Sequence, residues 1–108
     1  MYILVTYVPP SHLAVVQEAL FAAGAGKIGS YDHCSFQSLG VGQFRPLAGS
    51  DPFSGSVNEV ATVEEWRLEL VVEKENAPAA VKALLASHPY EVPAYHLIEA
   101  LTLENLEK

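Results

Sequence analysis

All seven glycines of this 108-residue chain lie between positions 24 and 55. Glycine is favoured where the backbone needs a positive φ or where another group approaches closely. Unusual backbone geometry is therefore expected in this middle stretch, and any site is expected to lie in it or against it. The two flanks carry ordinary helix and strand patterns.

The first flank predicts a strand and a helix. Residues 2–8 are almost entirely apolar at both odd and even positions, which is typical of a strand buried on both faces. The helix that follows is expected to begin with Ser11 as its N-cap and to end at Gly24. Its predicted buried stripe consists of the apolar residues at helical spacing, Leu13, Val16, Leu20 and Phe21.

The glycine-rich stretch predicts a second strand over residues 31–38. The parity of that strand directs Cys34 and Phe36 toward a core, and His33 toward solvent or a partner. The connection that follows, about 39–59, is expected to be long and decorated. It holds a turn or bulge at two glycines, a short extended piece at 43–45 and a loop over 47–58.

The second flank predicts a strand, a helix and a last strand. Residues 60–73 alternate most clearly, with Trp66, Leu68, Leu70 and Val72 on one face and Glu65, Arg67 and Glu69 on the other. Asn76 is expected to cap the helix, His88-Pro89 to end it, and residues 92–103 to form the strand. The helix is expected to bury Ala77, Val81, Leu84 and Leu85.

This order of elements, β-α-β-β-α-β, predicts a single α+β domain over residues 1–108. The ferredoxin-like plan has four antiparallel strands with both helices on one face of the sheet. The row formed by Glu65, Arg67 and Glu69 would then lie on the uncovered face, where it is either solvated or part of a subunit interface.

Charge and cysteine content limit the classes of function. The net charge is −7, from 13 acidic and 6 basic residues, which argues against nucleic acid or an anionic membrane as a partner. Cys34 is the single cysteine, so no intramolecular disulfide can form, and a cytoplasmic location is expected. No signal peptide is recognisable at Met1, and no apolar run approaches the roughly 20 residues of a membrane span.

Two groups of segments carry a family resemblance. GKIGSYDHCSF at 26–36, GVGQFRP at 40–46 and GSDP at 49–52 resemble the domain inserted in YqfO-type proteins of the dinuclear-metal-centre hexamer family. HPYEVPAY at 88–95 is similar to that insert and to CutA, the divalent-ion tolerance family. In matching order these segments cover essentially the whole chain, which looks like a stand-alone relative of the insert.

The resemblance implies the fold of the PII signalling proteins. CutA and PII proteins are trimers whose inter-subunit clefts can hold ligands, so a homo-oligomer, a trimer or its multiple, is expected. The metal-binding core of YqfO-type proteins has no matching positions here, and its suspected hydrolase-like activity is not transferred. A regulatory or structural role remains.

The candidate metal ligands are His33, Cys34 and His88, because imidazole and thiolate both bind zinc or copper. The structural alternative is a buried Cys34, a surface or interface His33, and a His88 that ends a helix. Adjacent residues on a strand point to opposite faces, so a shared metal would need His12, His88 or His96 nearby, including from another subunit.

The candidate ligand or interface residues combine glycines with aromatic and charged neighbours. They are Gly26, Gly29, Tyr31, Gly42, Phe44, Arg45, Tyr90 and Glu91. The structural alternative is that the glycines serve a helix cap and strand turns and that the aromatics pack in a core or an interface. No nucleophile–base pair stands at a recognisable spacing, so no enzyme activity is predicted.

The sequence therefore favours a non-catalytic oligomeric PII/CutA-like module that binds a small ligand or a partner protein. The alternative is a divalent metal-ion (copper or zinc) binding protein of CutA type. Its cofactor would be the divalent ion.

Overall fold

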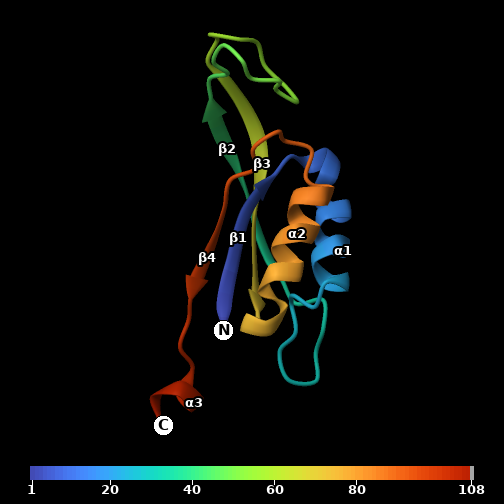
Figure 1. The fold of residues 1–108 in the computed structure, drawn as a ribbon, viewed down its shortest axis with the longest axis vertical. Helices are drawn as coiled ribbons and strands as arrows, with labels where there is room; N and C mark the ends of the chain where they lie inside the picture. Colours follow the sequence, from blue (N-terminus) through green and yellow to red (C-terminus); the bar gives the residue numbers. More distant parts are fainter. Residues whose placement is uncertain (108) are drawn as a thin grey trace.

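A four-stranded antiparallel sheet carries two helices side by side on one face (Figure 1). The structure, a computed structural model, describes residues 1–107. The strands, in the sheet order β2-β3-β1-β4, are β1 (Tyr2–Val8), β2 (Phe36–Phe44), β3 (Ala61–Val72) and β4 (Tyr95–Glu99). The helical elements are η1 (Pro10–His12), α1 (Leu13–Ala22), η2 (Lys74–Asn76), α2 (Ala77–Ser87) and α3 (Leu103–Leu106). This arrangement confirms the ferredoxin-like prediction.

The core lies between the sheet and the helix pair. Leu4 and Val8 of β1 are fully buried, and they lie opposite Leu70 and Trp66 of β3. The helices contribute buried residues from the predicted stripe of α1 and from α2: Val16, Leu20, Ala77, Ala80 and Leu84. Each large side chain that is fully buried contributes about 1.5–3 kcal/mol to folding.

The predicted end of the first helix is confirmed, but its predicted N-cap is wrong. Gly24 has φ +101°, its N–H donates to Phe21, and the N–H of Ala25 donates to Leu20, which together form a Schellman motif. Ser11 instead lies in η1, where its hydroxyl contacts the Nδ1 atom of His12. The short 3-10 turn that begins at Pro10 therefore replaces a side-chain cap.

The second helix differs from its prediction in two respects. Asn76 occupies the N-cap position but makes no side-chain capping bond, because its own backbone is already helical at the end of η2. Ala80 is fully buried, whereas Leu85 is 48% exposed. The side of α2 that packs against the core thus consists of Ala77, Ala80 and Leu84, and Val81 is only partly buried.

The predicted strand over residues 31–38 is wrong in its bounds, because only residues 36–38 of it lie in a strand. Strand β2 begins at Phe36 and continues through both predicted turn glycines to Phe44. Residues 23–35 form a loop, in which the N–H of Gly26 donates to Val71 and the N–H of Cys34 donates to Gly26. Phe36 pairs with Glu69 on the uncovered face and is 67% exposed, so it does not face the core.

The last strand is shorter than predicted. Strand β4 covers only Tyr95–Glu99, and the chain then leaves the sheet toward α3 (Figure 1). In the part of the chain that the structure describes, the helices are all too short to cross a membrane.

Candidate functional site

The β2–β3 hairpin extends past the end of β1. Strand β3 pairs with β2 from Ala61 to Glu69, but with β1 only from Trp66 to Val72. The stretch 61–65 therefore has no β1 partner. Beyond the end of β1, a pocket of about 290 Å³ lies between the hairpin, the loop 45–60 and the segment 88–94.

Residues from three strands and two connections line this pocket. They are Tyr7, Gln43, Phe44, Pro46, Ser50, Pro52, Phe53, Ser54, Glu65, Tyr90, Glu91, Val92 and Ala94. The lining is largely apolar and aromatic with a few polar groups, which is the usual composition of a small-molecule site.

A tyrosine–carboxylate pair forms part of the pocket lining. The hydroxyl of Tyr90 donates to Oε2 of Glu65 at 2.8 Å. Gly42 makes this possible, because a Cβ at that position would overlap the Glu65 carboxylate. Burial and the adjacent Glu65 carboxylate raise the pKa of Tyr90 above its ordinary value, so the phenol stays protonated and remains a donor.

His88 holds the segment 88–94 against the end of β1. The N–H of Tyr90 donates to Nδ1 of His88 at 3.1 Å, so the ring proton must be on Nε2, which donates to the carbonyl of Tyr7 at 2.7 Å. Burial lowers the pKa of His88, which favours this neutral form. Both ring nitrogens are thus occupied by the backbone, and His88 acts as a structural bridge.

The loop 45–60 folds back toward the helices. Phe53 contacts His12 edge-on, with ring centroids 5.5 Å apart, and it also contacts Tyr90 at 6.1 Å. The N–H of Asp51 donates to Oε1 of Glu91 at 3.0 Å. These contacts join the loop to the segment 88–94 across the pocket.

Four of the predicted ligand residues lie at this pocket, and the other four do not. Phe44, Tyr90 and Glu91 line the pocket, and Gly42 lies against Glu65. Arg45 is exposed and is not among the lining residues. Gly26, Gly29 and Tyr31 lie in the loop 23–35, next to the far end of β3 (Figure 1).

The sequence did not identify most of the residues that line the pocket, among them Tyr7, Phe53 and Glu65. The alternation of β3 places Glu65 on the uncovered face but does not connect it with a site. Gly42 on the neighbouring strand β2 indicates the position of Glu65, because it leaves room for the Glu65 carboxylate. This can be recognised only when the register of β2 against β3 is known.

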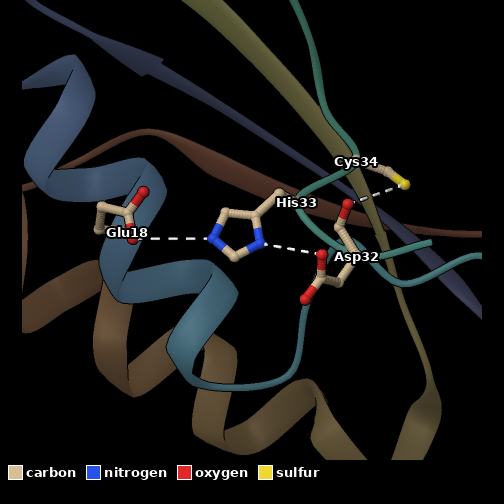
Figure 2. Close-up of polar contacts among 4 residues, drawn as sticks. All are labelled: Glu18, Asp32, His33 and Cys34. Atoms are coloured by element: carbon tan, nitrogen blue, oxygen red, sulfur yellow. Dashed lines mark hydrogen bonds and ion pairs between the residues drawn. The ribbon is translucent and has the colours of Figure 1, made fainter.

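The predicted metal ligands are not brought together by the structure. His33 lies between Glu18 and Asp32, at 3.8 and 3.2 Å, and the thiol of Cys34 points away from it toward the carbonyl of Asp32 (Figure 2). His33 has φ +54°, and its ring packs against that of Phe21 at the C-terminal end of α1. His88 follows the C-terminal end of α2, away from His33. Cys34 is half-buried rather than buried. Residues 1–107 contain no group of three histidine, cysteine or acidic side chains placed to hold a metal ion.

Comparison with known proteins gives one consistent picture of relatedness. The chain is 45% identical over 90% of its length to a GTP cyclohydrolase 1 type 2 homolog of Halalkalibacterium halodurans, and 48% identical over 87% to that of Bacillus subtilis. A crystal structure of a Bacillus cereus protein related to NIF3 superposes with a TM-score of 0.78 at 37% identity, covering 90% of this chain and 24% of that one. No protein-family model matches the chain.

The fold is shared more widely than the sequence. The PII-like protein CutA from Nostoc covers 99% of this chain and 91% of its own, with a TM-score of 0.63 at 20% identity. The chain spans about a quarter of the length of the GTP cyclohydrolase 1 type 2 homologs. It is therefore a relative of one segment of those proteins and has a PII/CutA-like fold.

Proposed function

We propose that this chain is a non-catalytic PII/CutA-like module that binds a small ligand in the pocket between residues 45–60 and 88–94. The carrying observation is the combination of a pocket of about 290 Å³ with fixed polar groups, because Tyr90 orients Glu65 and the backbone of Asp51 orients Glu91. Pre-oriented polar groups in an apolar pocket favour binding of a specific ligand.

The polar groups of the pocket favour binding rather than chemistry. Burial and the contact with Glu65 raise the pKa of Tyr90, so its phenol stays protonated. A reaction would require a nucleophile with a base in hydrogen-bond reach, and Ser50 donates its hydroxyl to the carbonyl of Leu47 instead. The relatives' name refers to a cyclohydrolase, but the match covers only about a quarter of their length.

We further propose that the module works as a homo-oligomer, a trimer or its multiple. Large apolar side chains stand exposed on the face of the sheet that carries no helix, including Phe36 (67%) and Ile98 (50%). The C-terminal segment adds Leu101, Leu103 and Leu106, each 67–68% exposed. Exposed apolar surface of this extent favours contact with another copy. Light scattering coupled to size exclusion would refute this part if the chain is monomeric.

The ligand site is tested by NMR chemical-shift mapping with a panel of neutral, anionic and cationic aromatic fragments. Shifts are expected to cluster at residues 43–54 and 90–94. The variant Ser54→Trp places a large side chain into the pocket and should abolish those shifts, while Ser30→Trp in the distant loop should preserve them. A panel that shifts only residues outside the pocket would refute the proposed site.

A further inference from the structure

The side chains that line the pocket have one chemical character. Four aromatic rings, from Tyr7, Phe44, Phe53 and Tyr90, accompany two carboxylates, from Glu65 and Glu91. The lining contains no lysine, arginine or histidine. Aromatic faces and carboxylates both attract positive charge, and no basic side chain in the lining offsets them.

We propose that this pocket binds an organic cation, an alkylammonium or guanidinium group held between the aromatic rings and the carboxylates of Glu65 and Glu91. This inference rests on the proposed function, because it names the ligand class of the same pocket. A cation over an aromatic face gains from the ring quadrupole, and it gains more when the site is partly desolvated.

The two carboxylates come from two different segments, Glu65 from β3 and Glu91 from the segment 88–94. Glu65 accepts from the hydroxyl of Tyr90 with Oε2, and its other oxygen lies over the bare backbone of Gly42. Glu91 accepts from the N–H of Asp51 with Oε1. Each carboxylate keeps lone pairs that can accept from a further donor. A ligand with several N–H groups, or with polarised C–H groups around a charged nitrogen, suits both.

Other ligand classes fit less well. An anion would meet two carboxylates in a chain of net charge −7. A neutral apolar ligand would desolvate Glu65 without supplying a donor, which is costly. Phe53 is 51% exposed in the free protein although it stands at an aromatic site, so a bound cation can cover it.

The test compares choline with its neutral isostere, 3,3-dimethylbutan-1-ol, by NMR titration of the full chain. Choline should shift residues 43–54 and 90–94 and bind at least about tenfold more tightly than the alcohol. Glu65→Gln and Glu91→Gln should each weaken choline binding by about three- to tenfold. Glu64→Gln is the matched control, because it removes the same charge from the same strand on the opposite face and should leave the affinity unchanged.

The outcomes separate the ligand class from the pocket. Equal binding of the alcohol in the same pocket would overturn the cation assignment and leave the proposed function standing. The cation assignment would also be overturned if choline shifted no pocket residue while neutral or anionic fragments did. The proposed function would again stand. If no fragment of any charge binds there, the proposed function itself fails. Glu91 is exposed, so its variant tests the proposal even if Glu65→Gln proves unstable.

The cation can belong to a free small molecule or to a side chain of a partner protein. Titrations with butylamine and with the peptide Gly-Gly-Lys-Gly-Gly distinguish these sources, since both present the same primary ammonium. Tighter binding of the peptide would assign the site to a polypeptide, and tighter binding of butylamine to a small molecule. If choline shifts the pocket residues but neither butylamine nor the peptide does, the site is restricted to quaternary ammonium groups.

Discussion

Replacing Gly42 by alanine should break the contact that organises the pocket, whereas the same change at Gly40 should not. Both glycines lie in β2 on the same face of the sheet, and neither has a positive φ. A Cβ at position 42 would overlap the carboxylate of Glu65 and lie 2.8 Å from its carboxyl carbon. A Cβ at position 40 would have no neighbour within 4 Å.

The expected magnitude follows from what the Glu65 side chain must give up. Its carboxylate can swing away, but it then loses the bond from the hydroxyl of Tyr90, which is worth about 1–1.5 kcal/mol. Both substitutions share the benefit of removing glycine from a strand, about 0.5–1 kcal/mol. Gly42→Ala should therefore be about 1 kcal/mol less stable than Gly40→Ala, which is about 4 °C in Tm for a domain of this size.

The measurement is urea unfolding of the two variants, each with and without Tyr90→Phe. Tyr90→Phe should cost about 1 kcal/mol when Gly42 is intact and close to nothing when it is combined with Gly42→Ala, because the partner carboxylate has then already moved. The oligomeric state of every variant must be the same for the comparison to hold. Equal stability of Gly42→Ala and Gly40→Ala, with an unchanged cost of Tyr90→Phe, would refute the reasoning.

Three further predictions follow from other parts of the chain. The folded protein should lose stability as pH falls from 7 to 5, because burial lowers the pKa of His88 below 6.5 and unfolding then takes up a proton. Chemical denaturation should show a shallower dependence of stability on pH in His88→Gln than in the unchanged chain, and an equal dependence would contradict the prediction. Gly26→Ala, with φ +77° and a Cβ 2.8 Å from the carbonyl of Cys34, should destabilise the chain by about 2 kcal/mol, more than Gly29→Ala in open space, as judged by thermal unfolding. Equilibrium dialysis of Zn²⁺ and Cu²⁺ against the full chain should show no binding tighter than micromolar, and tighter binding that is lost in His33→Ala would restore the metal hypothesis.

Local patterns predicted the parts of the fold that depend on local physics. The alternation in β3 placed Leu68, Leu70 and Val72 on the buried face, and their burial confirms it. Gly24 ends the first helix because only glycine takes that positive φ without strain. The order of helices and strands then left few ways to assemble the sheet.

The start of β2 could not be predicted from parity. Residues 33–37 alternate in polarity, but the N–H groups of Gly26 and Cys34 make hydrogen bonds that fold residues 23–35 into a loop. Gly40 and Gly42 resembled turn residues, although here they leave bare backbone on a continuous strand. The deciding contacts are between segments far apart in sequence, and local composition does not encode them.

The pocket itself follows from unequal strand lengths. After Val8 pairs with Trp66, the next partners of Glu65 and Glu64 would be Pro9 and Pro10. Proline has no N–H to donate to a neighbouring strand, so β1 stops while the hairpin continues. The edge of β3 at residue 65 therefore has no neighbouring strand, and the hydroxyl of Tyr90 can reach the carboxylate of Glu65. The two prolines thus leave an open strand edge, and the segment after α2 converts it into a site with an oriented carboxylate.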